Sequence, residues 1–143
     1  MPKNSFRLGV YPSSHYASLF DAAEIVIQPA CGGPRPWPEL SIATIGEGDL
    51  EFEILMPTEE GRTPPRHAAT ARSVLSQIVE MDDAARAVPD ATDFDLDEAL
   101  AYVVISDAYV EFHYFATTVN TEWGIYFTPN GQGVWNCRGF ERP

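Results

Sequence analysis

The stretch from residue 100 to residue 140 constrains the fold most, because it consists of β-rich runs separated by turn residues. Valine, isoleucine, tyrosine, phenylalanine, tryptophan and threonine dominate these runs, and such residues fit the pleated, half-buried surface of a sheet. Asn130-Gly131 between two of the runs is a strong hairpin signal, since both residues tolerate positive φ. We therefore expect three or four antiparallel strands here, connected as a C-terminal meander.

Two runs show the two-residue alternation of a strand with one buried and one exposed face. Between residues 109 and 116 the more apolar face carries Val110, Phe112, Tyr114 and Ala116. The mixed face carries Tyr109, Glu111, His113 and Phe115. Between residues 49 and 56, Glu51 and Glu53 lie opposite four apolar side chains, so we expect these two carboxylates to face solvent.

A long amphipathic helix is predicted near residues 65 to 87. Pro64 and Pro65 suit the first turn of a helix, and Val88-Pro89 ends it. The apolar stripe has helical spacing and consists of Ala71, Val74, Leu75, Ile78, Met81 and Ala85. Together with the strands, this helix predicts a single α+β domain over residues 1–143. Its antiparallel sheet would have five to seven strands, with the one long helix packed on it.

The charge balance is unusual, with 21 acidic and 9 basic side chains and a net charge of −12. Such a chain is not expected to bind nucleic acid or anionic membranes, and it favours a basic partner. Acidity for solubility alone is the alternative. The segment from 80 to 98 is the most acidic, and Arg86 is its one cation. Its carboxylates are Glu80, Asp82, Asp83, Asp90, Asp93, Asp95, Asp97 and Glu98.

No pattern in the chain predicts a metal or cofactor. The run Asp93-x-Asp95-x-Asp97-Glu98 lacks the glycine and the later glutamate of a helix-flanked calcium loop, so we expect a solvated acidic loop. The three histidines have no metal-binding spacing. We expect neither a signal peptide nor a membrane span, and therefore a cytoplasmic protein whose cysteines stay reduced.

Two local features are candidates for contact or chemistry. Residues 29 to 38 hold four prolines and two glycines, which predicts a surface loop. Trp37 in this loop either packs inward or serves as a contact residue. Glu111 and His113 share a strand face, and Glu122 could lie on the next strand. This trio would make either an acid–base site or a structural contact on the sheet.

The order of several short patterns resembles small bacterial α+β domains, which are similar to immunity proteins of polymorphic-toxin and secretion-delivered toxin systems. The patterns are Trp37-x-x-Leu-x-Ile, Leu50-Glu-Phe-Glu-Ile, Tyr109-Val-Glu-Phe-x-Tyr and Glu122-Trp-Gly-Ile-Tyr-Phe. The resemblance covers roughly residues 37 to 140. It implies a non-enzymatic antitoxin that binds and occludes a cognate, basic toxin domain, with no catalytic residues.

The expected interface combines carboxylates with an aromatic anchor, because binding energy concentrates in a few such side chains. Its residues are Asp90, Asp93, Asp95, Asp97, Glu98, Glu51 and Glu53, with Trp37 or Tyr109 as the anchor. The chain would be a monomer or, if an edge strand near residues 134 to 140 pairs with a second copy, a homodimer. The alternative function is a small enzyme or small-molecule-binding domain that uses the sheet face around His113.

Overall fold

A computed structural model describes residues 8–29, 39–46, 50–88, 99–116 and 121–143. A short 3-10 turn at Leu8–Val10 precedes the first helix. The helices are α1 (Ser13–Ala22), α2 (Pro65–Leu75) and α3 (Ile78–Arg86). The strands are β1 (Val26–Pro29), β2 (Glu39–Ile45), β3 (Phe52–Pro57), β4 (Leu100–Ile105), β5 (Val110–Ala116), β6 (Thr121–Pro129) and β7 (Trp135–Gly139).

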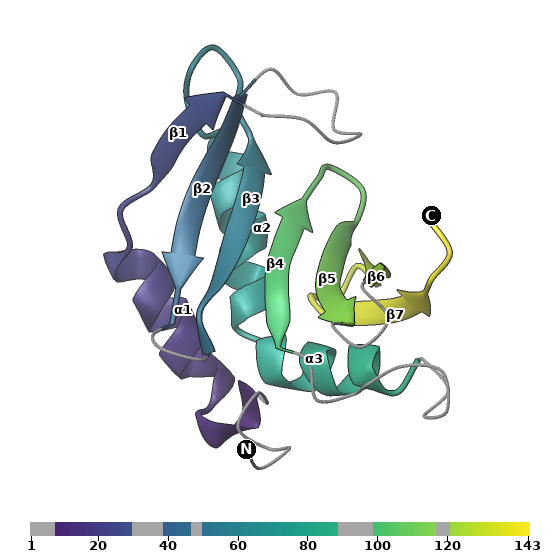
Figure 1. Cartoon of the computed structure of the whole chain (residues 1–143). Coiled ribbons are helices and arrows are strands. Elements are labelled where there is room, and N and C mark those ends of the chain that lie inside the picture. The colour runs from purple at the N-terminus through teal and green to yellow at the C-terminus, as the bar shows by residue number, and fades with distance from the viewer. Residues whose placement is uncertain (1–7, 30–38, 47–49, 89–98, 117–120) are drawn as a thin grey trace.

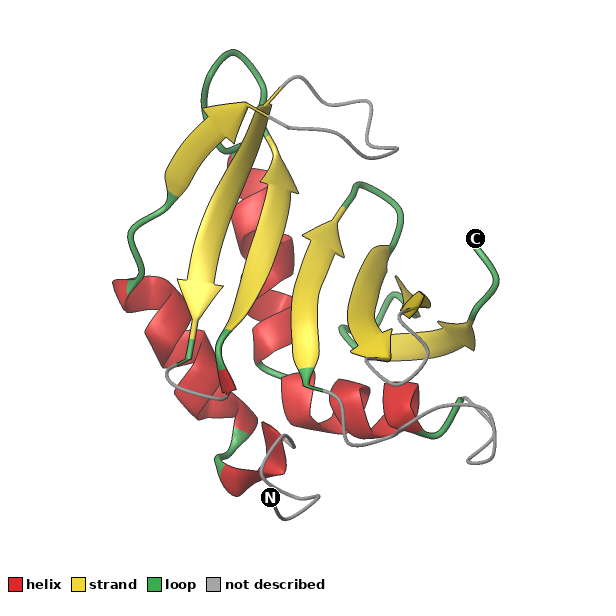
Figure 2. Ribbon diagram, viewed as in Figure 1, coloured by secondary structure: helices red, strands yellow, loops and turns green. Residues whose placement is uncertain are grey.

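Within the described residues, the seven strands form one sheet whose spatial order is the sequence order. Neighbouring strands pair antiparallel, except that β3 and β4 run parallel. A parallel pair needs a crossover connection, and α2 and α3 provide it. The helices gather on one side of the sheet (Figure 1, Figure 2). The structure is therefore α+β with an open, mostly antiparallel sheet.

The core lies between the helices and one face of the sheet. Phe52, Ile54 and Met56 of β3 are at most 1% exposed, while Glu53 between them is exposed. The same alternation buries Val110, Phe112, Tyr114, Ile125 and Phe127 of β5 and β6. Among the described residues, no helix is both long and apolar enough to cross a bilayer.

The single helix expected over residues 65 to 87 is two helices, α2 and α3, which meet at Ser76 and Gln77. Gln77 has φ −128° and ψ 11°, outside the helical range. Its side chain leaves the helix to bind the β6–β7 hairpin: the amide donates to the carbonyl of Gly133, and its oxygen accepts from the backbone N–H of Trp135. The break between α2 and α3 therefore coincides with a contact to a segment far away in the sequence. The apolar stripe continues from α2 into α3.

Asp82 and Arg86 of α3 belong to the core and not to an acidic surface. They are 1% and 3% exposed, and Arg86 Nε donates to Asp82 Oδ2 at 2.9 Å. The hydroxyl of buried Tyr114 donates to the other oxygen of Asp82. The guanidinium also lies 5.2 Å from the centre of the Tyr114 ring. Two of the charges counted in the acidic segment are thus internal.

Candidate functional site

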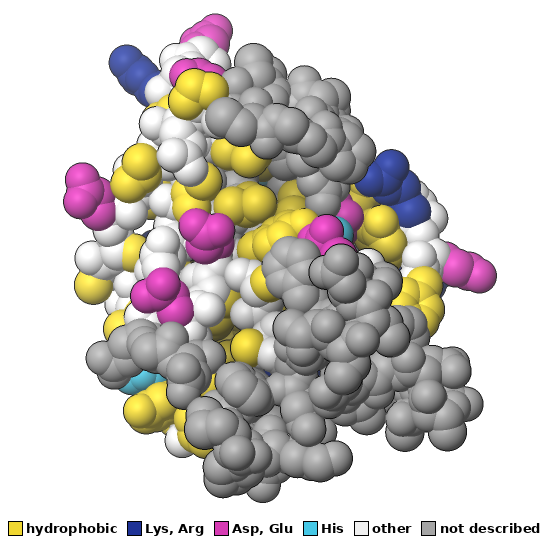
Figure 3. All heavy atoms as spheres, in the orientation of Figure 1, with side chains coloured by type: hydrophobic (Ala, Val, Ile, Leu, Met, Phe, Trp, Pro, Cys, Tyr) yellow, Lys and Arg dark blue, Asp and Glu magenta, His cyan; other side chains and the backbone are white. Residues whose placement is uncertain are grey.

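The face of the sheet opposite the helices, which we call the helix-free face, carries two rows of side chains that run across the strands. One row consists of Thr44, Glu53, Tyr102, His113 and Gly124. The other consists of Val26, Ile42, Leu55, Val104, Glu111 and Tyr126. Figure 3 views this face, where carboxylates interrupt the hydrophobic side chains. Val104 and Glu111 on this face are buried, whereas Val26 and Glu53 are exposed and Ile42 and Leu55 are half-buried, so its open part mixes apolar side chains with negative charge.

His113 is the centre of a polar cluster on this face. Its Nε2 lies 3.2 Å from Oε1 of Glu111, in hydrogen-bonding geometry. Its Nδ1 lies 3.2 Å from Oε1 of Glu122, an ion-pair contact that is not aligned as a hydrogen bond. The Tyr102 ring stacks on the imidazole at 4.5 Å between centroids and 11° between planes, and its hydroxyl donates to Glu122. The register of the strands thus brings together Glu111, His113 and Glu122, the three residues that the sequence suggested as a site.

The lack of a side chain at Gly124 makes room for the imidazole of His113. A Cβ at this position would lie 3.0 Å from Cε1 of His113 and 3.4 Å from its Nδ1, closer than side chains normally approach. The glycine therefore lets the ring lie against β6 while Tyr102 covers the ring's other side. Sequence reasoning named neither Tyr102 nor Gly124 as part of a site. A glycine inside a strand pattern is nevertheless a known signal of close approach.

The contacts of the cluster limit its chemistry. Glu111 is 2% exposed and the His113 side chain 11% exposed, so both are largely shielded from water. Ionised carboxylates only accept hydrogen bonds, and a neutral imidazole carries one N–H. Because both ring nitrogens and one ring face of His113 already contact neighbouring side chains, the geometry suits a positioned polar group better than a general base.

Tyr109, the proposed aromatic anchor, is half-buried and already in contact with other residues. Its ring meets Tyr126 edge-on at 5.7 Å, and the guanidinium of Arg142 lies 6.0 Å from its centre. Burial raises the pKa of the Tyr126 hydroxyl, and the charge of Glu111 raises this pKa further. The Tyr109 ring is therefore held by contacts with other residues of the same chain.

The remaining predicted contact residues fall into two groups. Glu53 lies on the helix-free face, and Glu51 just before β3 is also exposed. The other predicted residues lie outside the described residues: Trp37, Asp90, Asp93, Asp95, Asp97 and Glu98. The structure therefore leaves the acidic loop and the tryptophan as predictions.

Several arginines of the described chain form ion pairs with carboxylates of the same chain, and each pair neutralises the carboxylate together with the arginine. The Arg66 guanidinium holds the pKa of both Glu59 and Asp107 below the usual range through hydrogen bonds. These pairs are Arg66 with Glu59 and Asp107, Arg72 with Asp21, and Arg86 with Asp82. Among the described residues, no arginine forms an ion pair with Glu51 or Glu53.

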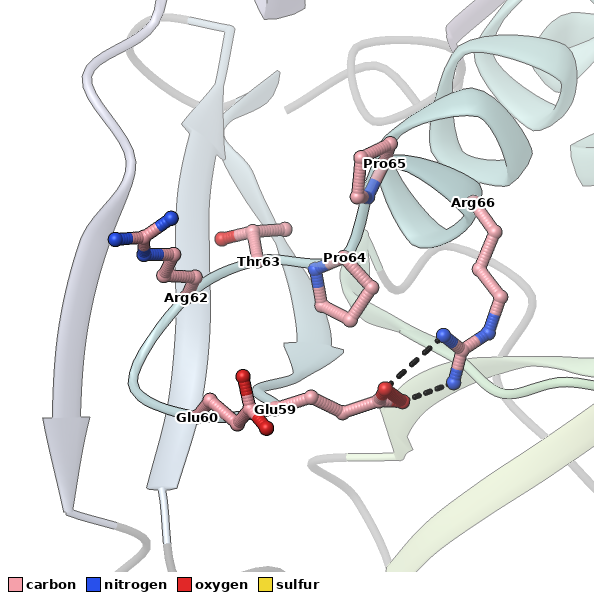
Figure 4. Close-up of a pocket in the computed structure, with 7 residues that line it drawn as sticks. All are labelled: Glu59, Glu60, Arg62, Thr63, Pro64, Pro65 and Arg66. Atoms are coloured by element: carbon pink, nitrogen blue, oxygen red, sulfur yellow. Dashed lines mark hydrogen bonds and ion pairs between the residues drawn. The ribbon is translucent and has the colours of Figure 1, made fainter.

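Two hollows occur elsewhere on the described chain. The larger, about 480 Å³, lies at the β3–α2 connection and is lined by Glu59, Glu60, Arg62, Thr63, Pro64, Pro65 and Arg66. Figure 4 shows that the Arg66 guanidinium turns toward Glu59, while Arg62 extends away from both. The smaller, about 270 Å³, lies beside Gln77 between α3 and the β6–β7 hairpin. Neither hollow includes the His113 cluster.

Comparison with known proteins yields no relative. No protein-family model matches the chain, and neither a curated protein nor a solved structure matches it significantly. Among the described residues, no group of three or more histidine, cysteine, aspartate or glutamate side chains is arranged to hold a metal ion.

Proposed function

We propose that this chain is an acidic binding protein that acts as an immunity protein and occludes a basic bacterial toxin domain in the cytoplasm. The observation that carries the proposal is the helix-free face, where carboxylates stand among apolar side chains on a chain of net charge −12. The described arginine ion pairs involve neither Glu51 nor Glu53, so the charge of these two exposed carboxylates is not neutralised in this way. Such a surface attracts a basic partner and speeds its encounter.

In this proposal, binding has an electrostatic and an apolar step. Long-range attraction from Glu51, Glu53 and the loop that carries Asp93 and Asp95 would raise the association rate. Contact with apolar and aromatic side chains would then hold the complex, because screened surface charges alone contribute little affinity. A partner that acts on nucleic acid fits this arrangement, since carboxylates can take the place of phosphates on its basic surface.

The first experiment is coexpression of the tagged chain with the product of the adjacent reading frame in its native host, followed by pull-down at low and at high salt. We expect a stoichiometric basic partner, weaker retention at high salt, and toxicity of the partner when it is expressed alone. Recovery of the chain by itself at both salt concentrations would overturn the proposal.

A charge-neutralised pair of variants then tests the face. In Glu51→Gln/Glu53→Gln we expect the association rate to fall about threefold and its salt dependence to weaken, because steering depends on local charge. The control, Glu60→Gln/Glu141→Gln, removes the same charge from exposed positions elsewhere. Equal effects of the two double variants would mean that the helix-free face has no special role.

The acidic loop has its own test. We expect replacement of Asp93, Asp95 and Asp97 by asparagine to slow association and to flatten the dependence of the rate on ionic strength. Stopped-flow mixing at several salt concentrations measures both. Unchanged association kinetics would remove this loop from the interface.

A second candidate function is small-molecule binding at the His113 cluster. The observation that favours it is the assembled trio, in which both ring nitrogens lie 3.2 Å from a carboxylate oxygen. Mixtures of small metabolites can be screened by NMR for shifts of the imidazole signals of His113, with His15 as the reference signal. Shifts at His113 alone would support this function, and unchanged signals across the mixtures would exclude these ligands.

A further inference from the structure

The two edges of the sheet are unequally protected. β1 pairs with β2 on one side, and all four of its residues are exposed. Its neighbourhood holds three exposed aliphatic side chains, Ile25 at 38%, Val26 at 51% and Ile27 at 39%. Proteins normally shield an edge strand with charge, a bulge or a covering element, because its open backbone groups recruit other strands. The run Val-Ile-Gln-Pro has no charged residue, and only its final proline opposes pairing.

The opposite edge, β7, shows the usual protection. It alternates between half-buried and exposed residues, and Trp135 and Cys137 pack against the core. Arg138 adds an exposed charge in the middle of the strand, and the pairing with β6 contains a register irregularity. Val134 and Phe140, which flank β7, are also exposed, at 49% and 47%, but the exposed residues within β7 itself, Asn136 and Arg138, are polar, whereas those within β1 include Val26 and Ile27.

β1 offers apolar side chains on both of its faces. Val26 continues the row that includes Ile42 and Leu55 on the helix-free face. Ile27 lies opposite Ser41, which shares the buried, helix-facing side of β2 with Ala43 and Ile45. Ile27 nevertheless stays 39% exposed. Among the described residues no strand pairs with the outer side of β1, so an added strand could cover apolar surface on both of its faces while it pairs with the backbone of Ile25 to Gln28.

We propose that β1 is a docking edge to which an extended, cation-flanked segment of the protein partner adds as an eighth strand. The identity of the partner rests on the proposed function, whereas the mode of binding does not. The charges around β1 indicate which kind of segment would bind to it. β1 itself is neutral, but exposed Glu24 precedes it and Glu39 pairs with its last residue, Pro29. A second copy of a chain with a net charge of −12 would be repelled, whereas lysine or arginine at the ends of an added strand would be attracted.

Three synthetic peptides test the mode of binding without the natural partner. The first alternates valine and threonine between terminal lysines, the second replaces the lysines by glutamates, and the third is the lysine peptide N-methylated at alternate residues. N-methylation removes the donors that a strand needs while it keeps charge and composition. We expect the first peptide alone to shift the amide signals of Ile25 to Gln28 and to slow their hydrogen exchange. Equal binding of the lysine peptide and its N-methylated form would overturn strand addition, and equal binding of the glutamate peptide would overturn the charge argument.

A matched pair of variants locates the site. Val26→Lys places a charge on β1, and Val10→Lys places the same charge at a valine that is 55% exposed in the 3-10 turn. We expect Val26→Lys to weaken binding of the lysine peptide at least about tenfold and Val10→Lys to leave it within about twofold. Equal effects would place the peptide elsewhere, and a dimer seen by sedimentation at the same concentrations would assign the edge to a second copy. A toxic basic partner whose binding ignores Val26→Lys would leave the proposed function standing and overturn the docking edge.

Discussion

The buried ion pair of α3 predicts a specific pattern of stability in a double-mutant cycle. Asp82 accepts from Arg86 and from the hydroxyl of Tyr114, and all three side chains are at most 3% exposed. Replacing Arg86 by methionine keeps a long side chain but leaves a buried carboxylate without its cation. Replacing Asp82 by leucine leaves the guanidinium in the same position. Loss of one partner of a buried pair costs about 3–5 kcal/mol of the free energy of unfolding.

The double variant Asp82→Leu/Arg86→Met should be far closer to the parent than either single variant. It removes both buried charges together, and an apolar pair of similar volume often replaces a buried ion pair at little or no cost. We therefore expect a loss within about 2 kcal/mol, part of it from the Tyr114 hydroxyl that loses its acceptor. The coupling energy would be several kcal/mol.

Urea unfolding at pH 7 measures these differences, and fluorescence of Trp123, which stacks on Tyr114 at 4.6 Å, reports on this part of the core. The matched control is Arg72→Met, because Arg72 pairs with Asp21 at 2.6 Å on the exposed surface. An exposed pair of this kind contributes at most about 1 kcal/mol. Additive losses in the double variant, or an Arg86→Met variant no less stable than Arg72→Met, would refute the reasoning.

The pH dependence of the free energy of unfolding gives a second test of the buried Asp82–Arg86 pair. Burial raises the pKa of Asp82, while Arg86 and Tyr114 oppose this rise. In Arg86→Met one opposing group is lost, so the folded-state pKa moves further above the unfolded value. A raised folded-state pKa of an acid means stability that is present at low pH and lost as pH rises through that pKa. The deficit of Arg86→Met should therefore shrink between pH 7 and pH 5, and that of Arg72→Met should not follow this trend.

Three further predictions concern single residues. Burial lowers the pKa of His67, so the unfolded chain binds a proton at this residue at a higher pH than the folded chain does. The free energy of unfolding should therefore fall as the pH drops from 7.5 to 5.5. Chemical denaturation of His67→Gln should show a weaker fall over the same range. Gly124→Ala should cost about 1 kcal/mol, because its Cβ would meet the His113 ring at 3.0 Å, and the His113 NMR signals should move with it. Gln77→Ala removes two hydrogen bonds to the β6–β7 hairpin and should lower stability by about 1–2 kcal/mol in urea unfolding.

The sequence predicted which faces of the helices and strands are buried, because the spacing of apolar residues follows the side of each element that packs in the core. The stripe expected between residues 65 and 87 is buried at Ala71, Val74, Ile78, Met81 and Ala85. It could not predict the break between α2 and α3, since the stripe runs through Ser76 and Gln77 without a change of phase. At the break, Gln77 makes two hydrogen bonds to backbone groups 56 and 58 residues away, and no local sequence pattern contains such contacts.

Charge was harder to interpret than hydrophobicity. Asp82 lies four residues after Ile78 and so shares the buried side of α3, yet its residue type predicts exposure. Its burial depends on Tyr114, 32 positions later, and on Arg86 one turn along. Counting carboxylates in a segment therefore overstates how many of them reach the surface. The helical position of each one gives a better prediction.

The His113 cluster shows how far strand register decides a site. Alternation along β5 places Glu111 and His113 on one face, but it does not say which residue of β6 lies opposite. The observed register sets His113 opposite Gly124, and Glu122 two residues earlier on the same face of β6. A slip of one residue would turn Glu122 toward the core. Because His113 and Tyr102 both hold Glu122, its carboxylate is oriented before a partner arrives. An oriented charge loses little conformational entropy on binding, which supports a binding role for this face more than proton transfer.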